Sequence, residues 1–540
     1  MQESLPSNVD VLVVGMGPVG ATAANLLGRC GLRTLVIDAA HDIYMAPRAI
    51  VLDNEALRIL QMAGLEDGAF ATCAIAQVQM RSPLFGRYAR ANTAGQIDCH
   101  PQLVTFHQPE LERVLRARLR QYACVRTALG TELADFTQDQ HGVRASLRQA
   151  DGTLATVQAR FLIGADGASS FVRRHLGLGF EGKTFTQDWL VVDVLDAPVP
   201  ISDIEFICDP RRPSPHMPAP GNRQRWEFML HPGETREQME HPDTIGALLA
   251  PWCDARDCTI ERTAVYRFHA RIVDRFSNGR VFLAGDAAHI TPPFVGQGLV
   301  AGLRDVANLC WKLDWVAQGR APLSMLESYD TERRPHARAI INLARMMGAL
   351  VMPRNRAMAL LTHGLMGILH RLPFTRPLFE DLKIKPANRF PRGLFQPGRG
   401  GARLVRGGPL PQGLLRRLAG APCVPSDDYL GGALTLIGFG CDPAAQLGPQ
   451  LAAAWQAAGA RIVALRHRGQ ADLGEAAWED VTDSLVPGAA PVGWVAAVRP
   501  DRVVLHDGPL ARVDDIVRES LALLGCASPG TVASLSPVTS

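Results

Sequence analysis

The sequence predicts an α/β fold, in which a domain built on a parallel sheet is interrupted by a mostly β insertion and followed by a smaller α/β unit. Two observations carry this prediction. Apolar runs at 11–14, 161–163 and 281–284 end in Gly or Asp turns that lead into helix-forming stretches, as strand–turn–helix units do. Within 183–268, stretches such as 223–230 alternate polar and apolar side chains, which is typical of strands with two different faces. The length of 540 residues allows two or three domains.

The first strand–turn–helix unit carries a dinucleotide-binding pattern. An apolar run leads into Gly15-x-Gly17-x-x-Gly20, a helix of small residues follows, and a second apolar run ends in Asp38. Gly15 permits the tight turn, Gly17 lets the backbone approach a pyrophosphate, and Gly20 lets the helix pack against the strand. The helix N-terminus stabilises phosphate charge, and Asp38 can accept hydrogen bonds from ribose hydroxyls. We expect this unit, with Pro18 at the helix start, to hold NAD or FAD.

Two later loops decide between these cofactors. Residues 161–177 form an apolar strand that runs into Asp166-Gly167 and a helix containing Arg173. Residues 279–313 form another strand that runs into a Gly-Asp pair, a Pro-Pro turn and a glycine pair before a helix. A domain that binds only NAD needs neither loop. The acids could also serve as helix caps, because Asp is a favoured N-cap residue.

In this order, the three motifs resemble those of the single-component FAD-dependent aromatic hydroxylases. The resemblance covers almost the whole chain and includes stretches outside the motifs, such as PRAIVLDNEALRILQMAGL and GLRDVANLCWKL. It implies a Rossmann-like FAD-binding domain, an inserted substrate sheet and a thioredoxin-like tail. It also implies that Asp286 binds the ribityl hydroxyls of FAD. Arg48 and Gln108 would lie near the ribose, phosphate and adenosine of FAD, and the Asp166 motif would contact both FAD and the pyridine nucleotide. The remaining expected cofactor residues are Gly285, Pro293, Gly296, Gly298, Leu299 and Val300.

The last of these loops contains one departure from the family. After Gly296 and Gly298 the family usually has Asn, where this chain has Val300. Gly298 and Leu299 open a helix whose amides can face the flavin pyrimidine carbonyl, and a helix N-terminus favours the negative charge of reduced flavin. If the contacts at this point are mainly from the backbone, the replacement leaves flavin binding intact. If the Asn side chain matters, flavin affinity or position differs.

The resemblance implies an oxidoreductase that reduces FAD with NADH or NADPH and reacts it with dioxygen to give a flavin hydroperoxide. The distal oxygen then goes to an activated ring, so the expected reaction is ortho-hydroxylation of a phenolic acid such as 3-(3-hydroxyphenyl)propionate. A substituted phenol, a resorcinol, a quinolone and a polyketide are alternatives. The Trp-x-Trp-x-Ile-Pro motif of flavin halogenases is absent. A catalytically decayed flavoprotein that serves as a binding module is the non-enzymatic alternative.

Such a reaction benefits from a base near the phenol, because phenolate is the better nucleophile. Asp53 is the first candidate, since a related phenol hydroxylase carries an acid at this position. The competing interpretation is a helix cap, because Asp-x-x-Ala precedes an apolar run. His289, in the Gly-Asp motif, is interpreted as structural, packing under the flavin loop.

The insertion is expected to be a sheet that forms the lid of the substrate site. On the strand at 223–230, Arg225 and Glu227 share one face, and the apolar Trp226 and Phe228 share the other. We expect the apolar face to wall the ring pocket. Arg212 and Arg225 could each bind the carboxylate of the substrate through two parallel hydrogen bonds. The alternative is that both are solvated arginines on the surface.

The predicted domains are an FAD-binding domain in two parts, 1–182 and 269–385, a substrate sheet at 183–268, a linker at 386–415 and a tail at 416–540. The linker is rich in Pro, Gly and Arg. The tail lacks a Cys-x-x-Cys pair, so thiol redox chemistry is not expected there.

Composition excludes several other classes. The net charge of +3, without a block of like charges, argues against a nucleic-acid partner. No signal peptide is recognisable and no apolar run reaches about 18 residues, so we expect a cytoplasmic protein without a membrane partner. The most apolar stretch, 358–372, is expected to be a packed helix. Cys253 and Cys258 are expected to be reduced, no metal site is expected, and a homodimer is plausible.

Overall fold

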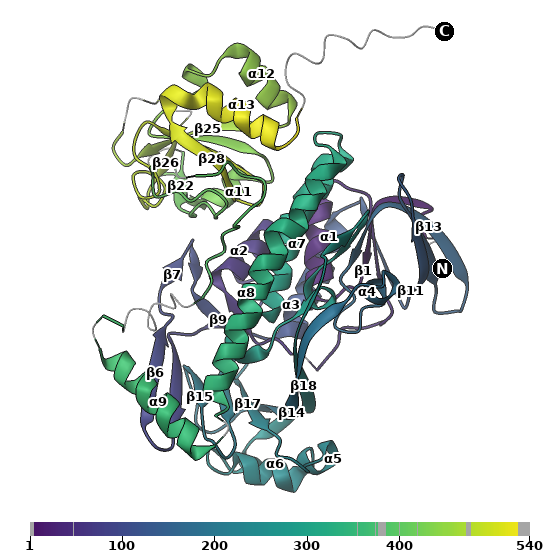
Figure 1. Cartoon of the computed structure of the whole chain (residues 1–540), viewed down its shortest axis with the longest axis vertical. Coiled ribbons are helices and arrows are strands. Elements are labelled where there is room, and N and C mark those ends of the chain that lie inside the picture. Colours follow the sequence, from purple (N-terminus) through teal and green to yellow (C-terminus); the bar gives the residue numbers. More distant parts are fainter. Residues whose placement is uncertain are drawn as a thin grey trace.

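The computed structural model describes residues 5–526, except 47, 354, 373, 376–384, 399, 418–419, 471–472 and 474–476. Figure 1 shows three parts: a main sheet with its helices, an insert sheet below it, and a tail domain above. The tail domain is coloured green to yellow because it is C-terminal. The parts of the predicted domains at 376–384 and 527–540 lie outside the described residues.

The main sheet consists of β1 (Asn8–Val14), β2 (Thr34–Asp38), β10 (Val125–Leu129), β11 (Glu132–Gln138), β12 (Val143–Arg148), β13 (Leu154–Gly164), β19 (Ser277–Asn278) and β20 (Val281–Leu283). Its order is β10-β2-β1-β13-β12-β11, and β20 also pairs with β13. β10, β2, β1, β13 and β20 run parallel, whereas β12 and β11 are antiparallel additions at one edge. The central strands are buried Val, Leu and Ile runs, as parallel strands covered on both faces require.

Helices pack on this sheet through small and apolar residues. α1 (Pro18–Arg29) packs against α3 (Gln108–Arg118) and α7 (Gly298–Ala317), and α7 packs against α2 (Asn54–Met62) and α8 (Ser328–Val351). The short helices are η1 (Leu119–Gln121), α4 (Phe171–His175), η3 (Gly285–Ala287), η4 (Pro293–Val295) and η5 (Leu323–Glu327). There are also two small sheets. One contains β3 (Val51–Asp53), β9 (Leu103–Phe106) and β4 (Thr72–Ala74), in that order, and the other pairs β7 (Gln96–Ile97) with β8 (His100–Pro101).

The insert sheet contains β21 (His289–Ile290), β18 (Thr259–Val273), β14 (Phe180–Leu195), β17 (Arg223–Met229), β16 (Ser214–Ala219), β15 (Ile204–Ile207), β5 (Gln77–Ser82) and β6 (Gly86–Asn92), in that order. It is therefore larger than the predicted 183–268, because β15 pairs in parallel with β5. One face is covered by α5 (Arg236–Met239) and α6 (Pro242–Leu249), with η2 (Ala255–Asp257) following. The other face turns toward the main domain.

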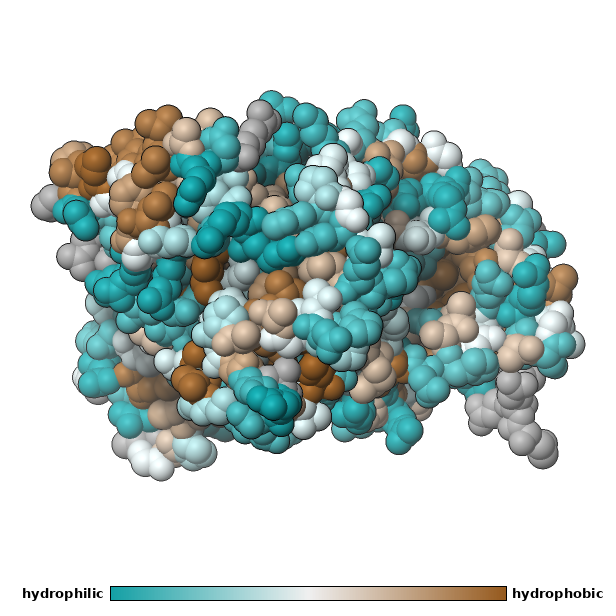
Figure 2. Space-filling model, turned by 90° about the horizontal axis from the view of Figure 1, so that it is seen from below, coloured by the Kyte–Doolittle hydropathy of each residue, from teal (hydrophilic) through white to brown (hydrophobic). Residues whose placement is uncertain are grey.

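The apolar stretch at 358–372 is packed on one side only. It forms α9 (Arg356–Arg371), which lies against β6 and buries Ala359 and His363. The opposite face leaves Leu361 and Ile368 70% and 60% exposed. Figure 2 shows a brown area at the upper left, on the side where α9 lies. The prediction of a packed helix thus holds only for the side of α9 that faces β6. Among the described residues, no helix has the length and apolar character needed to cross a membrane.

The tail domain contains a mixed sheet in the order β23 (Val424–Pro425), β22 (Leu414–Arg416), β26 (Trp478–Asp480), β25 (Arg461–His467), β24 (Thr435–Phe439), β27 (Trp494–Val498) and β28 (Val504–Pro509). Its helices are α11 (Ser426–Leu430), η6 (Pro443–Ala445), α12 (Pro449–Ala457), η7 (Leu510–Arg512) and α13 (Val513–Leu523). The thioredoxin-like character of this domain stays a prediction.

Buried ion pairs fix the tail domain to the rest of the molecule. Glu332 of α8 contacts Lys312 of α7 at 2.8 Å and Arg499 of the tail at 2.7 Å, and all three side chains are fully buried. On the other side, Arg58 of α2 contacts Asp427 of α11 at 2.7 Å. Of the predicted linker at 386–415, the described residues up to 413 form no helix or strand, and 414–415 belong to β22. The tail domain is therefore held as a fixed part of the fold.

Candidate active site

A cavity of about 1270 Å³ extends from the loop after β1, along the insert sheet, to the segment before the tail domain. Its lining includes Gly17 at one end, Met217 on the insert sheet and Pro409 beside the tail. Single-ligand pockets occupy about 300–1,000 Å³. The cavity therefore has room for a dinucleotide and a second ligand together.

The glycine loop has the geometry that the motif predicts. Gly15 has a φ of +100°, and a Cβ added there would lie 2.4 Å from the carbonyl oxygen of Ala165. A Cβ on Gly20 would lie 1.9 Å from the oxygen of Gly15, so neither position accepts a side chain. An added Cβ on Gly17 meets nothing within 4 Å, and Gly17 lines the cavity. The backbone at the start of α1 is thus open to a phosphate group.

Of the other predicted residues near the glycine loop, one lines the cavity and two lie behind its surface. The Asp38 carboxylate accepts hydrogen bonds from the amides of Met16 at 2.7 Å and Ala40 at 2.8 Å, so it braces the glycine loop. Asp166 lines the cavity and accepts from the Ser170 hydroxyl at 2.6 Å. Arg173 lies behind it and donates to backbone carbonyls of both neighbouring loops. The predicted ribose contact of Asp38 stays a prediction.

The loop after β20 presents an acid that pairs with none of the residues the structure describes. Asp286 lines the cavity, and no hydrogen bond or ion pair joins its carboxylate to any described residue. Burial raises the pKa of Asp286, although Arg48 and His289 act in the opposite direction. His289 does not line the cavity, and its Nε2 lies 2.7 Å from the buried Asp305 carboxylate, which fits the structural role expected for it. Asp286 is suited to accept hydrogen bonds from ligand hydroxyls.

The start of α7 also faces the cavity. Gly298 and Leu299 line it, and the N-cap residue Gln297 makes no side-chain capping bond, which leaves the first amides available. Val300 is fully buried and packs in a cluster with Leu52 and Leu303. The side chain at the position where the family has Asn therefore contributes to the core.

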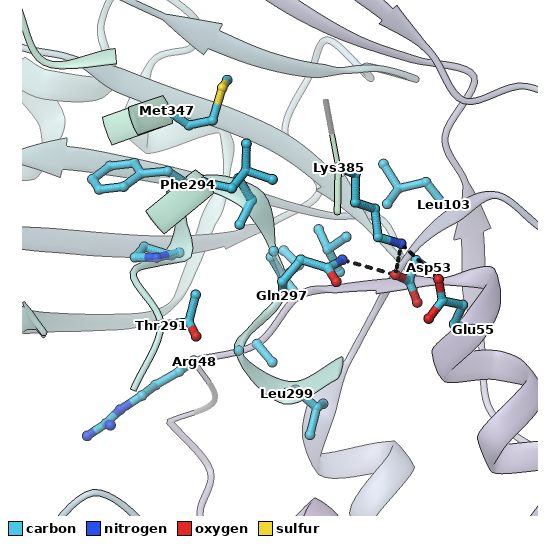
Figure 3. Close-up of a pocket in the computed structure, with 18 of the residues that line it drawn as sticks. Arg48, Asp53, Glu55, Leu103, Thr291, Phe294, Gln297, Leu299, Met347 and Lys385 are labelled. Carbon is cyan, nitrogen blue, oxygen red and sulfur yellow. Dashed lines mark hydrogen bonds and ion pairs between the residues drawn. The ribbon is translucent and has the colours of Figure 1, made fainter. Parts of the chain in front are cut away.

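Asp53 is the centre of a buried charged cluster. It caps α2 by accepting from the Ala56 amide at 2.9 Å, so the helix-cap interpretation is confirmed. Its other oxygen lies 2.6 Å from Lys385 Nζ and 3.0 Å from both Arg304 and Gln297. Figure 3 shows Lys385 and Gln297 converging on Asp53.

These contacts determine the protonation of the Asp53 carboxylate. Burial alone would raise its pKa, but Lys385 and Arg304 hold the pKa well below its usual range. A carboxylate stabilised in this way is a weak proton acceptor. Its catalytic role stays a prediction, which the geometry does not favour.

The insert sheet turns the opposite face to the cavity from the one we predicted. Trp226 and Phe228 pack against α6, on the face away from the cavity. Glu227, with Val191 opposite it in register and Met217 nearby, lines the cavity instead. The expectation that the apolar face walls the ring pocket is therefore wrong, because α6 covers that face.

Both arginines proposed for the substrate carboxylate already have acidic partners. Arg212 lies 3.0 Å from Glu234 and does not line the cavity. Arg225 donates from Nε and Nη2 to the two carboxylate oxygens of Asp193, at 2.6 and 2.9 Å. Its Nη1 donates to the carbonyl oxygen of Arg48 at 3.0 Å. Arg225 thus supports the wall of the cavity from behind. The structure does not bring these two arginines together at a ligand site.

Of the predicted site residues, those that line the cavity are Gly17, Pro18, Arg48, Asp53, Gln108, Asp166, Gly167, Asp286, Pro293, Gly296, Gly298 and Leu299. Those that lie behind its surface are Gly15, Gly20, Asp38, Arg173, Arg212, Arg225, Gly285 and Val300. The sequence did not identify Lys385, which is 332 positions from Asp53 and carries no motif. It placed Glu227 on a strand face without assigning it to the cavity.

FAD fits this arrangement. The open backbone at Gly17 suits its pyrophosphate, the partnerless Asp286 suits its hydroxyls, and the first amides of α7 suit an electron-rich ring. Arg48 reaches the cavity away from the Asp53 cluster (Figure 3), with its guanidinium 5.3 Å from the Tyr266 ring centroid. Its positive charge is available to a phosphate or ribose.

Comparisons with known proteins agree with this assignment. The sequence model of the FAD binding domain family matches residues 8–344, and that of the HcaD C-terminal domain matches 407–524. A 3-(3-hydroxy-phenyl)propionate/3-hydroxycinnamic acid hydroxylase of Burkholderia cenocepacia is 37% identical over 476 residues, 86% of this chain and 85% of the relative. A hydroxylase of the same name from Comamonas testosteroni is 34% identical, over 86% of this chain and 87% of its own.

Solved structures share the fold at lower identity. The flavin-dependent monooxygenase PieE, in complex with FAD and substrate, has a TM-score of 0.79 at 22% identity, over 96% of this chain and 100% of its own. Aklavinone-11 hydroxylase, with FAD and aklavinone, has a TM-score of 0.73 at 24% identity and the same coverage. With the match to the FAD binding domain and relatives that align along most of both chains, the chain belongs to the FAD-dependent aromatic hydroxylases, and FAD is its cofactor.

Proposed function

We propose that this enzyme uses NADH or NADPH and dioxygen to hydroxylate a phenolic acid next to its hydroxyl group, with 3-(3-hydroxyphenyl)propionate as the first substrate to test. The observation that carries this proposal is the 34–37% identity, over most of the chain, to hydroxylases named for that compound and for 3-hydroxycinnamic acid. The cavity supports it, because its volume of about 1270 Å³ exceeds the range of about 300–1,000 Å³ that is typical of a site for one ligand.

The chain contributes binding and exclusion of water. Bound FAD supplies the oxidation–reduction chemistry that activates dioxygen. The substrate part of the cavity is apolar, with Met80, Phe206, Phe294 and Leu350 among its lining residues, and this surface suits an aromatic ring. A dry site of this kind protects reactive species from water.

Cations on the same lining are candidate partners for the carboxylate of a phenolic acid. Arg90 and Arg389 line the cavity with Lys385. Lys385 contacts Asp53 and Glu55, so it is already charge-compensated. Arg389 is therefore the better candidate for a substrate carboxylate, because no ion pair joins it to any residue that the structure describes.

The test measures NADH oxidation by the purified FAD-loaded enzyme with and without 3-(3-hydroxyphenyl)propionate, with peroxide and the catechol product assayed together. We expect the compound to stimulate NADH oxidation and to yield the 2,3-dihydroxyphenyl product in equal amount. Stimulation that yields mostly peroxide would mean that the compound binds without being the native substrate. No stimulation, with either NADH or NADPH, would refute the assignment of this substrate and direct the assay to larger phenols.

A further inference from the structure

Glu227 is an isolated acid on the substrate side of the cavity. It lies in β17, lines the cavity and is only 8% exposed. No hydrogen bond or ion pair joins its carboxyl group to any residue that the structure describes. Buried carboxyl groups in proteins are nearly always paired, so a partnerless one facing a cavity indicates that a ligand supplies the partner.

The other acids of the lining do not share this character. Asp53 has four donors and Asp166 accepts from Ser170, so both are satisfied by the protein. Glu55 and Asp98, which also line the cavity, are each paired with an arginine. Asp286 lacks a partner, but it belongs to the loop after β20 that faces the cofactor. Glu227 stands on the insert sheet, where Val191 pairs with it in register and also lines the cavity, in the part that the proposed function assigns to the substrate.

The charges around Glu227 come from three strands. Arg225 lies on the same strand, Asp193 on β14, and Arg262 on β18. Arg225 and Arg262 both contact Asp193, at 2.6 and 2.9 Å, so much of their positive charge is directed away from Glu227. Burial raises the pKa of Glu227, and Arg225 offsets this only in part. The group can therefore hold or release a proton closer to neutral pH than an ordinary glutamate.

We propose that Glu227 is the residue that binds the phenol hydroxyl and accepts its proton, an inference that rests on the proposed function. In this step the O–H bond of the phenol breaks, its electron pair stays on the phenol oxygen, and a new O–H bond forms on the Glu227 carboxylate. No oxidant or reductant takes part. An ionised Glu227 would repel a substrate carboxylate at this position, because like charges at a buried site repel. The phenol hydroxyl is the group of a phenolic acid that can donate a hydrogen bond here.

The test compares Glu227→Gln and Glu227→Asp with the wild type, all loaded with FAD. Glu261→Gln is the matched control, because Glu261 lies on β18 of the same sheet, pairs with Arg223 and does not line the cavity. Each variant is assayed for catechol product across pH with 3-(3-hydroxyphenyl)propionate and with a ring-fluorinated analogue, whose hydroxyl is more acidic. Circular dichroism and the flavin spectrum check folding and FAD binding.

General base catalysis typically contributes about 10²–10⁴-fold, so Glu227→Gln should lose about 100-fold of the product-forming rate at pH 7. The loss should shrink about tenfold or more with the fluorinated analogue and at high pH, where the phenol ionises without help. Glu227→Asp should recover part of the rate, and Glu261→Gln should behave as the wild type.

An unchanged rate and pH profile in Glu227→Gln, or an equal loss with both substrates, would overturn the inference while leaving the proposed function intact. Failure of the wild type to hydroxylate any phenol would overturn the proposed function and this inference together. If Glu227→Gln does not fold, Glu227→Asp decides the question. Its partial loss of rate should again shrink with the fluorinated analogue and at high pH, and an equal loss with both substrates would overturn the inference.

Discussion

Replacing Asp53 with Asn tests whether this residue stabilises the fold rather than accepting a proton. Asn keeps the oxygen that caps α2, because Asn and Asp are about equally good N-cap residues. It replaces the second carboxylate oxygen with a donor that faces three donors, from Lys385, Arg304 and Gln297, at 2.6–3.0 Å. The Asp53 and Arg304 side chains are 5% and 2% exposed, so water cannot compensate.

Removing one partner of a buried ion pair costs about 3–5 kcal/mol. Glu55 remains beside Arg304 at 2.6 Å and beside Lys385 at 3.5 Å, so we expect about 3 kcal/mol, at the low end of that range. The measurement is the free energy of unfolding of the FAD-saturated enzyme. Asp188→Asn is the control, because Asp188 pairs with Arg267 at the surface and such pairs contribute about 0–1 kcal/mol.

The sign of the pH dependence follows from the lowered pKa of Asp53. A carboxyl group with a depressed pKa in the folded state stabilises the fold above its unfolded pKa of about 3.9, and this contribution is lost as pH falls further. The stability difference between the wild type and Asp53→Asn should be constant from pH 5 to pH 8 and shrink below about pH 4. A cost below about 1 kcal/mol at pH 7, within the range of surface pairs, would refute the reasoning. So would a catalytic pH profile whose acid limb disappears in Asp53→Asn, because Asp53 would then be the base.

Three other substitutions have defined outcomes. Gly20→Ala places a Cβ 1.9 Å from a carbonyl oxygen of the same turn, so we expect at least tenfold weaker FAD binding in a fluorescence titration; wild-type affinity would contradict the geometry of the loop. Glu332→Gln leaves Lys312 and Arg499 buried without their shared acid, so it should lower the free energy of unfolding by about 3–5 kcal/mol. It should also make the tail domain accessible to limited proteolysis, and an unchanged cleavage pattern would contradict the docking role of Glu332. Val300→Asn puts an amide into an apolar cluster and should lower the free energy of unfolding of the FAD-free protein by about 1–3 kcal/mol. A gain in stability would mean that the amide finds a polar partner there.

The sequence determined the local parts of the site. A strand, three spaced glycines and a helix suffice to build the phosphate loop, because the positive φ of Gly15 and the close approach of Gly20 to the Gly15 carbonyl oxygen arise within the turn itself. The same holds for Asp53 as the N-cap of α2, since a cap bonds to an amide three residues along the chain. These features depend on short segments, and short segments can be interpreted without the rest of the fold.

Tertiary structure alone decided which groups face the cavity. The alternation along β17 separates Glu227 from Trp226 and Phe228, but only the position of α6 determines which of the two faces is covered. Likewise, the protonation of Asp53 depends on Lys385, which arrives from 332 positions away. The effect of a carboxyl group on a reaction depends on the charges and solvent around it, and those come from segments that meet only when the chain has folded.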